Sequence, residues 1–275
     1  LTAKLSGATP ETVTFSVNVL DNIPPDNQDI VFADSVIVKG KTEINIVSSG
    51  DKDNTVWIAP AGTTEFTEGT TITKTTGLSL KIKTPEAEGE YFVYVLDASG
   101  NISDPSKKKI TVDNTAPVNQ NDVFSENKEI IESQSLTITP TGNVKESIWI
   151  APAGTTEFVE GNSIKKTAGD SITIIVPSIP GEYKIFVMDE AGNVSEATTK
   201  TLTVKSANTA PVISEIADQT IDEDSETGEL AFTISDGQTA AGELVLTAVS
   251  DNAELVPASD IILSGSDGNR KIKIR

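Results

Sequence analysis

Aspartate and asparagine residues gather at a few points of this chain, and oxygen ligands on loops are what calcium prefers. The densest group lies near the C-terminal end, at Asp218, Asp222, Glu223, Asp224, Glu226 and Asp236. Two further pairs stand just before prolines, at Asp21-Asn22 and Asp113-Asn114. These residues predict calcium sites. Because no EF-hand spacing is present, the alternative that they are solvated turn residues of an acidic protein stays open.

Most other site chemistry is excluded by what the sequence lacks. It contains no His and no Cys, which rules out a Ser–His–Asp triad, a thiolate nucleophile, a CxxC zinc site and an iron–sulfur cluster. The net charge of −20 repels polyanions and disfavours nucleic-acid binding. No apolar run approaches the roughly 20 residues of a membrane-spanning helix. The sequence therefore predicts a protein that is not an enzyme, binds no nucleic acid and has no membrane span in this segment.

A long internal repeat organises the chain. The stretch 56–66 recurs almost letter for letter at 148–158, an offset of 92 positions. Gly-Glu-Tyr at 89–91 and Asp-x-x-Gly-Asn at 97–101 recur at the same offset. A junction phrase that ends in proline precedes each copy and appears a third time at 207–211. We therefore expect a terminal strand at 1–20, two similar modules at 21–112 and 113–206, and an incomplete module of another type at 207–275.

The local pattern inside each module is that of β-strands. Short runs rich in β-branched and aromatic residues, such as 90–96 and 171–176, are bounded by Gly, Pro, Asn or Asp. About seven such runs occur per module, as in a β-sandwich, and no helical stripe is sustained. The sequence predicts an all-β fold with Trp57 and Trp149 at the core position of the sandwich.

Two finer details agree with a sandwich. Tyr91 and its repeat Tyr183 follow Gly-Glu as tyrosine-corner residues do, and the residue two positions later, a cysteine in antibody domains, is aliphatic. The stretches 97–101 and 189–193 predict tight turns, because an aspartate can accept hydrogen bonds from the backbone ahead of it and glycine supplies a positive φ.

These motifs resemble tandem bacterial immunoglobulin-like modules, which occur in surface-layer and large cell-wall-associated proteins of Gram-positive bacteria. The resemblance rests on Trp-Ile-Ala-Pro-Ala-Gly-Thr-Thr-x-Phe, Gly-Glu-Tyr and Asp-x-x-Gly-Asn-x-Ser, which each module carries once. The third module, through 216–224, 230–236 and 248–252, resembles the cadherin-like repeat of giant bacterial adhesins. Both resemblances imply sandwiches in an extended array on the cell surface. They point to no particular ligand, since a fold does not dictate a function.

The cadherin-like resemblance also implies calcium clamps at the junctions. The pairs Asp21-Asn22 and Asp113-Asn114 would act with Asp29 or Asp122 to join neighbouring modules. At the third junction Ala207 replaces the aspartate, which puts a clamp there in doubt. A calcium ion at a junction would stiffen a linker that prolines already restrain.

The two ends of the chain raise two interpretations. The third module is shorter than its neighbours, and residues 11–20 alternate as a terminal strand that leads straight into a junction phrase. One interpretation is an excerpt from a longer tandem array. The other is a fibre subunit whose N-terminal strand completes the last module of the next copy, because strand addition repairs an open sheet edge and an exposed apolar core. Such head-to-tail contacts propagate as a filament.

The sequence thus predicts a structural component of an extracellular bacterial surface assembly, such as a surface layer, a stalk or a fibre. Its partners would be copies of itself or neighbouring modules, with cell-wall or host glycan as a further candidate. Two alternatives stay open: an adhesin segment that binds glycan or host protein, and accessory modules of an extracellular polysaccharide-degrading enzyme. Trp57 and Trp149 would suit a sugar-stacking platform, although one tryptophan per module at a core position is more typical of packing.

Overall fold

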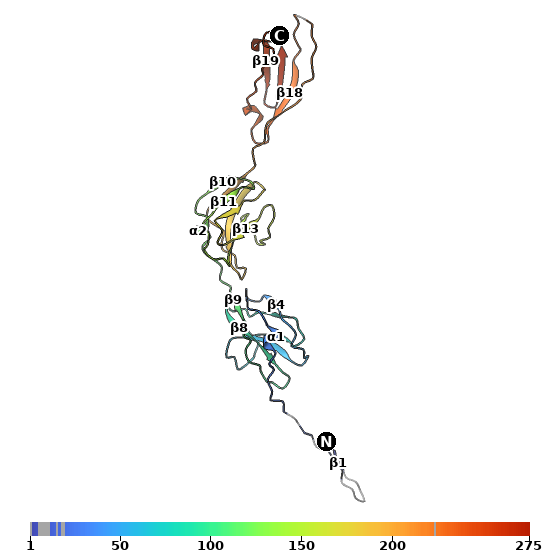
Figure 1. The fold of residues 1–275 in the computed structure, drawn as a ribbon, viewed down its shortest axis with the longest axis vertical. Helices are drawn as coiled ribbons and strands as arrows, with labels where there is room; N and C mark the ends of the chain where they lie inside the picture. The colour runs from blue at the N-terminus through green and yellow to red at the C-terminus, as the bar shows by residue number, and fades with distance from the viewer. Residues whose placement is uncertain (1, 5–11, 15, 18–19, 223) are drawn as a thin grey trace.

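The structure, a computed structural model, describes residues 2–4, 12–14, 16–17, 20–222 and 224–275. It is a row of separate β-sheet units, with β1 near one end and the C-terminal sheet at the other (Figure 1). Its helices are single turns, namely α1 (Gln28–Val31), α2 (Gln120–Val123) and 3₁₀ turns at Ala241–Glu243 and Ala258–Asp260. None of the described helices is long and apolar enough to cross a membrane. The predicted all-β fold is confirmed.

A short hairpin stands at the N-terminal end. Strand β1 (Thr2–Lys4) pairs antiparallel with β2 (Thr12–Thr14). Of the strand predicted over 11–20, residues 11, 15, 18 and 19 lie outside the described residues. The side chains of Val17 and Leu20, which follow β2, are 59% and 80% exposed. These two apolar groups therefore face solvent rather than a core.

The first β-sandwich contains seven strands, as predicted. They are β3 (Val36–Val38), β4 (Glu43–Asn45), β5 (Thr55–Ala59), β6 (Thr73–Thr76), β7 (Lys81–Lys83), β8 (Gly89–Leu96) and β9 (Lys109–Val112). One sheet has the order β3-β9-β8-β5-β6, and the other is the pair β4-β7. Strand β3 runs parallel to β9, and all other pairs are antiparallel.

The second sandwich repeats the first strand for strand. Its strands are β10 (Lys128–Ile131), β11 (Ser135–Thr137), β12 (Ser147–Ala151), β13 (Lys165–Ala168), β14 (Thr173–Ile175), β15 (Gly181–Met188) and β16 (Leu202–Lys205). The sheets are β10-β16-β15-β12-β13 and β11-β14. Tyr91 Oη donates to Ala87 O at 2.8 Å and Tyr183 Oη to Ile179 O at 2.7 Å, which confirms the tyrosine corners. The fold is that of immunoglobulin-like sandwiches in tandem.

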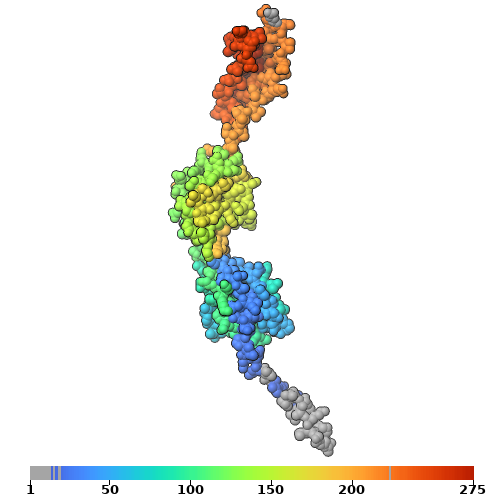
Figure 2. All heavy atoms as spheres, viewed as in Figure 1, coloured from blue at the N-terminus to red at the C-terminus, as the bar shows by residue number. Residues whose placement is uncertain are grey.

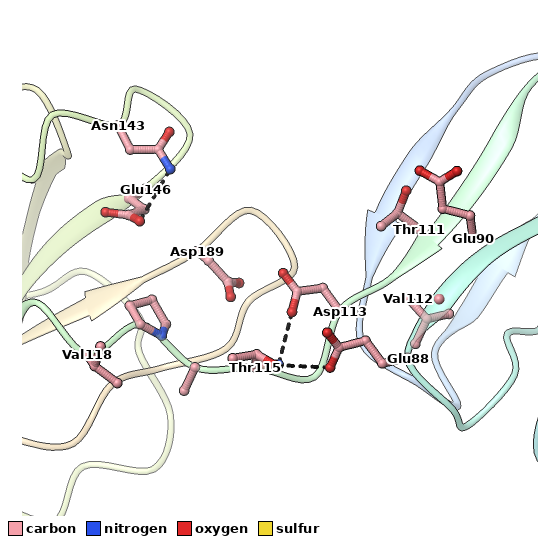
Figure 3. Close-up of a pocket in the computed structure, with 13 residues that line it drawn as sticks. Glu88, Glu90, Thr111, Val112, Asp113, Thr115, Val118, Asn143, Glu146 and Asp189 are labelled. Carbon is pink, nitrogen blue, oxygen red and sulfur yellow. Dashed lines mark hydrogen bonds between the residues drawn. The ribbon is translucent and has the colours of Figure 1, made fainter.

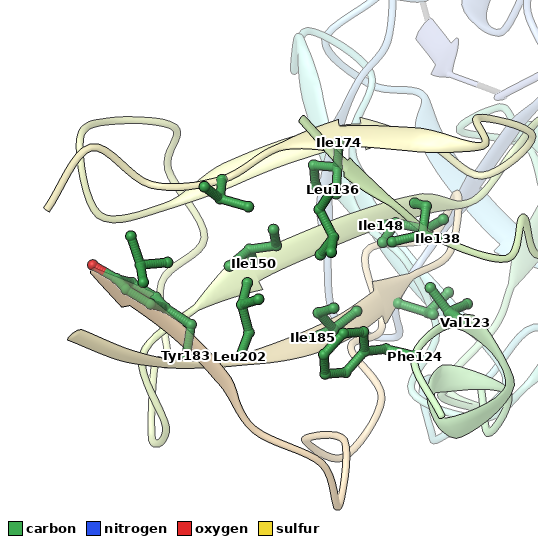
Figure 4. Packing of buried hydrophobic residues seen from close by; sticks show 13 residues of the cluster. Val123, Phe124, Leu136, Ile138, Ile148, Ile150, Ile174, Tyr183, Ile185 and Leu202 are labelled. Carbon is green, nitrogen blue, oxygen red and sulfur yellow. The ribbon is translucent and has the colours of Figure 1, made fainter. Parts of the chain in front are cut away.

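The core of each sandwich is built by alternate residues of facing strands. In the second sandwich Ile148, Ile150, Ile185 and Leu202 are fully buried with Leu136 from the opposite sheet (Figure 4). A strand points successive side chains to opposite faces, so one apolar residue in two enters the core. The aliphatic residue predicted at the antibody cysteine position, Ile185 here, is among them. Packing thus replaces the disulfide.

The tryptophans do not lie where the sequence analysis placed them. Trp57 is buried, but it belongs to a separate cluster with Phe66 and Tyr94 on the other face of its sheet. Its neighbours Val56 and Ile58 enter the core between the sheets, and the two-residue period of a strand then turns Trp57 outward. The expected core position between the sheets is therefore wrong, although the expected packing role is right.

The third unit is a single sheet. Its strands are β17 (Val212–Ile213), β18 (Leu230–Ser235), β19 (Ile261–Ser266) and β20 (Asn269–Ile274), in the order β17-β18-β20-β19 and all antiparallel. The alternating strand predicted at 270–274 is confirmed. The four buried hydrophobic clusters of the described chain all lie in the two sandwiches. The third unit therefore has a sheet without a developed core.

Candidate functional site

The linker between the two sandwiches carries two of the predicted site residues, Asp113 and Asn114. Asn114 Oδ1 accepts a hydrogen bond from the backbone N–H of Gly40 at 2.8 Å, and its Nδ2 donates to Glu86 O at 3.0 Å. Thr115 Oγ1 donates to a carboxylate oxygen of Glu88 at 3.0 Å. Side chains of the linker thus fasten it to two loops and a strand end of the first sandwich.

The second sandwich holds the same linker from the other side. In the turn 189–193, the backbone N–H and the Nδ2 of Asn193 both donate to the Asp189 carboxylate, at 2.8 and 2.9 Å. Nδ2 of Asn193 also donates to the backbone carbonyl of Asp113 at 2.9 Å. Asn193 is nearly buried, and its amide is therefore oriented by Asp189 and aimed at the linker. The linker is hydrogen-bonded to both modules.

The contact is repeated one module earlier. Asn101 Nδ2 donates to Asp97 Oδ2 at 2.8 Å and to the backbone carbonyl of Asp21 at 2.9 Å. Gly100 of this turn has a φ of +90°, which glycine adopts without strain. We name Asp97–Asn101 and Asp189–Asn193 the linker turns. Their tight geometry was predicted, but their bond to the preceding linker was missed. The sequence did carry a signal for this bond, because the junction phrase and the turn both recur at the same offset.

The carboxyl group of Asp97 titrates below its ordinary range. The Asn101 side chain, followed by backbone N–H groups of the turn, stabilises the charged form and lowers its pKa from the usual 3.8. A depressed folded-state pKa contributes stability that is present above the unfolded pKa and lost as the pH falls through the folded value.

We therefore expect the first sandwich to lose thermal stability below about pH 4, as Asp97 gains a proton and releases Asn101. Calorimetric melting between pH 3 and 7 checks this. The Asp97→Asn variant should melt lower at neutral pH and show a shallower acid slope. Asp34→Asn, which changes an exposed carboxylate elsewhere in the same module, should keep the wild-type slope. Equal slopes in all three proteins would contradict the assignment.

A hollow of about 600 Å³ lies between the two sandwiches, beside the linker that joins them (Figure 3). Five carboxylates line it, namely Glu88, Glu90, Asp113, Glu146 and Asp189. Each already accepts a hydrogen bond or pairs with a cation of the protein: Glu88 and Asp113 with Thr115, Glu90 with Lys109, Glu146 with Asn119 and Asn143, and Asp189 with Asn193. The hollow is acidic, but each of its carboxylates is already engaged with a donor or cation of the protein.

The other predicted junction ligands lie away from this hollow. Asp29 accepts the backbone N–H of Lys107 at 2.7 Å and pairs with that lysine's ammonium group; the backbone bond and then the side chain lower its pKa. The residue that repeats this contact in the second module is Asn121, which accepts from Thr199 N at 2.9 Å, rather than Asp122. The structure therefore does not bring Asp29 or Asp122 to the junction aspartates.

Asp21 and Asn22 precede the first module. Asp21 Oδ1 accepts the N–H of Ile23 at 3.1 Å, and its main-chain carbonyl faces Asn101 as described. Both residues are exposed. At the third junction, Ala207 N donates to Glu132 at 3.1 Å and Thr209 N to Gln238 at 2.9 Å, so one side chain of each neighbouring unit binds this linker. It forms the narrow neck between the second and third units in Figure 2.

The C-terminal acidic residues do not gather at one place. Asp222 and Asp224 lie with Glu226 along a groove that Leu255 and Val256 also line. Asp236 instead accepts the N–H groups of Gln238 and Thr239 within its own turn, and Asp218 does not line the groove. Glu223 lies outside the described residues.

The described members of this set do not assemble a calcium site as they lie. Among the described residues, no three acidic side chains converge as a metal site requires, whereas calcium takes 6–8 oxygen ligands. Asp21, Asp113 and Asp236 accept backbone N–H groups of their own turns. Calcium binding therefore stays a prediction of the sequence.

Aromatic side chains give no sugar-stacking surface in the described part of the chain. Trp57 and Trp149 are buried, and every other described aromatic residue is buried or half-buried. Lys74 and Lys166 further cover the tryptophan rings, with Nζ 5.1 and 5.3 Å from the ring centroids. The tryptophans therefore pack, as the sequence analysis favoured.

Comparison with known proteins assigns the chain to no family. No family model matches it, and no curated protein matches it. Among solved structures, extracellular domains 3–5 of Drosophila OTK are similar at 11% identity with a TM-score of 0.31, over 88% of this chain and 84% of that one. Fibronectin(III)-like modules of Clostridium thermocellum CbhA are similar at 15% identity with a TM-score of 0.30, over 63% of this chain and 90% of that one.

A third similar structure is the mixed-linkage glucan utilization protein SGBP-B of Bacteroides ovatus in complex with a heptasaccharide. It is 17% identical with a TM-score of 0.24, over 69% of this chain. The chain spans 47% of the length of that protein. Such low identities carry nothing about binding or activity, and the fold assignment rests on the sheet orders and registers above.

Proposed function

We propose that this chain is a non-catalytic structural segment of an extracellular surface assembly, in which the two sandwiches act as a stiff spacer. The engaged carboxylates of the junction hollow and the buried aromatic residues support a structural role over an active site or a glycan platform. Placement in a bacterial surface layer, stalk or fibre is part of this proposal and follows from the motif resemblance.

The observation that carries the spacer function is the linker held from both sides. Asn114 binds it to the first sandwich, and Asn193 binds its backbone to the second. An unheld linker would leave relative domain motion as the default. Asn101 makes the same bond to Asp21, so the linker contact repeats once per module. A longer array of these modules would carry it at each junction of this kind.

Spin labels at repeated positions test the stiffness of the junction. The chain has no cysteine, so that Glu65→Cys and Glu157→Cys, both at exposed sites, label one equivalent position in each sandwich. We expect a narrow distance distribution by double electron–electron resonance. Adding Asn193→Ala should broaden this distribution, because the linker then keeps its bonds to the first sandwich only.

A matched control comes from the repeat. Asn101→Ala makes the same change in the first sandwich. It releases Asp21, which lies outside the measured junction, and should therefore leave the distribution narrow. Labels at 157 and 253, which report on the linker at 206–211, should give a broader distribution than 65 and 157. A broad wild-type distribution for 65 and 157, or no effect of Asn193→Ala, would contradict the spacer function.

The assembly partner in this proposal is a second copy of the chain. Residues 1–20 of one subunit would complete the third unit of the next, which makes the spacer a fibre subunit. Calcium at the acidic turns would add stiffness where an ion binds. Glycan or host-protein binding, the other candidate role, has no specific feature of the described residues in its favour.

A further inference from the structure

Four side-chain amide oxygens are buried in the two sandwiches without a hydrogen-bond donor among the described residues. They are Asn27 Oδ1 and Gln28 Oε1 in the first sandwich, and Asn119 Oδ1 and Gln120 Oε1 in the second. The two pairs stand at the repeat offset of 92 positions. In the described chain, only Arg270 Nε is in the same condition. A chance packing defect would not be expected at the same two positions of both sandwiches.

The two glutamines lie in the single-turn helices that follow the linkers. Gln28 begins α1 and Gln120 begins α2, and their exposed fractions are 8% and 7%. In the second sandwich, Val123 and Phe124 of the same turn belong to the core between the sheets (Figure 4). Each glutamine is therefore more than nine-tenths buried beside a core, where an acceptor oxygen without a donor costs free energy.

The orientation of the asparagine amides is fixed by their nitrogen atoms. Asn27 Nδ2 donates to Ser49 O at 2.8 Å. Asn119 Nδ2 donates to Glu146 Oε2 at 3.3 Å. Exchange of oxygen and nitrogen would set an acceptor against an acceptor in both places. Neither asparagine oxygen caps its helix. Both oxygens therefore need a donor that the surrounding side chains and backbone do not supply.

The two copies of this site share no charge. Gln28 is followed by Asp29, which is engaged with Lys107, whereas Gln120 is followed by Asn121. A ligand common to both sandwiches therefore has to bind neutral amide oxygens. Calcium takes 6–8 oxygen ligands, and no three acidic side chains of the described residues converge. The repeat thus favours a neutral hydrogen-bond donor over a cation.

The surroundings favour a very small donor. The hollow at the junction is lined by Glu146 but by neither Asn119 nor Gln120, so the two oxygens do not open into that space. Water donates two hydrogen bonds, and buried waters usually bind polar groups that are otherwise unsatisfied. Globular proteins hold about one buried water per 27 residues, so one in each sandwich lies well within the usual number.

We propose that each sandwich holds an internal water molecule. It is bound by Asn27 Oδ1 and Gln28 Oε1 in the first sandwich, and by Asn119 Oδ1 and Gln120 Oε1 in the second. The water donates one hydrogen bond to each oxygen and so completes the hydrogen bonding of the turn that follows each linker. This inference does not depend on the proposed function, because it concerns the interior of each module.

Water relaxation dispersion and calorimetry test the site with one substitution in each sandwich. Gln120→Met removes the acceptor oxygen and keeps an unbranched side chain, and Gln28→Met does the same in the first sandwich. Gln134→Met is the matched control, because Gln134 is an exposed glutamine of the second sandwich. Deuteron relaxation dispersion counts the waters that stay in the protein for longer than the protein takes to tumble.

We expect the dispersion amplitude to fall by the equivalent of one water in Gln120→Met and in Gln28→Met, by two in the double variant, and not at all in Gln134→Met. The melting temperature of the substituted sandwich should fall as well, because its water loses a partner. An oxygen without any partner would give the opposite sign, since removal of an unsatisfied buried acceptor is neutral or stabilising.

The wild type gives a readout that does not depend on the folding of a variant. The side-chain amide protons of Gln28 and Gln120 should show an Overhauser effect to water with the sign of a long residence time. Absence of this effect, an unchanged dispersion amplitude in the methionine variants, or a raised melting temperature would overturn the proposal. A calcium-dependent rise in melting temperature that Gln120→Met abolishes would also overturn it, because the ligand would then be a cation.

Discussion

Replacement of Trp149 by alanine is expected to lower the free energy of unfolding of the second sandwich by about 3–5 kcal/mol, the usual cost of removing a buried tryptophan. Trp149 is 5% exposed and meets Phe158 edge to face, with ring centroids 5.6 Å apart. Its Nε1 donates to Ser147 Oγ at 2.8 Å. Alanine would leave a cavity under the segment that carries Phe158 and would remove the partner of that ring.

The repeat supplies both reporter and control for this experiment. The sequence has two tryptophans, so that in the Trp149→Ala variant Trp57 fluorescence follows the first sandwich alone. That signal should unfold at the wild-type urea concentration, while calorimetry shows the second transition moved to lower temperature. Trp57→Ala should produce the reverse pattern. If either variant shifted the unfolding transitions of both sandwiches, the Trp57 and Trp149 clusters would be energetically coupled. Distant sites are expected to be independent.

Replacement of Ile150 by alanine is expected to cost the second sandwich about 2–5 kcal/mol. Ile150 lies between the sheets, pairs in register with Ile185, and both side chains are fully buried. Alanine would leave a cavity beside Ile185, where β12 and β15 now pack against each other. The close-packed surroundings cannot relax enough to fill it. Urea titration followed by the fluorescence of Trp149, which sits on the opposite face of the same strand, measures the change.

The control for Ile150 is an isoleucine of the same sandwich that faces solvent. Ile175 on β14 is exposed, and its substitution by alanine should change the free energy of unfolding by no more than about 0.5 kcal/mol. Equal losses in the two variants would show that burial between the sheets does not determine the stability of this module.

Local pattern was enough to predict much of the fold. The strands at 90–96 and 171–176, the tyrosine corners and the tight linker turns each depend on residues close together in the chain. The face of Trp57 was not predictable in that way. Alternation separates two faces of a strand, but it does not say which face meets the second sheet when both carry large apolar groups.

The candidate site depended more on tertiary structure. Asp113 and Asn114 were expected at a junction and are there, yet the group that binds the Asp113 carbonyl, Asn193, lies 80 positions away from Asp113. Asp29 was expected to join them and instead binds Lys107. An aspartate side chain accepts whichever donor the fold brings nearest, and here that donor lies 78 positions further along in the same module.

By itself the sequence determined the repeat, the strand content, the junctions and the absence of histidine and cysteine chemistry, because these follow from residue type and short-range alternation. Only the tertiary structure decided that the linker turns bind the linkers, that the carboxylates lining the junction hollow are already engaged, and that the third sheet has no developed core. Each of these depends on contacts between residues far apart in the chain, and such contacts exist only once whole sheets have packed.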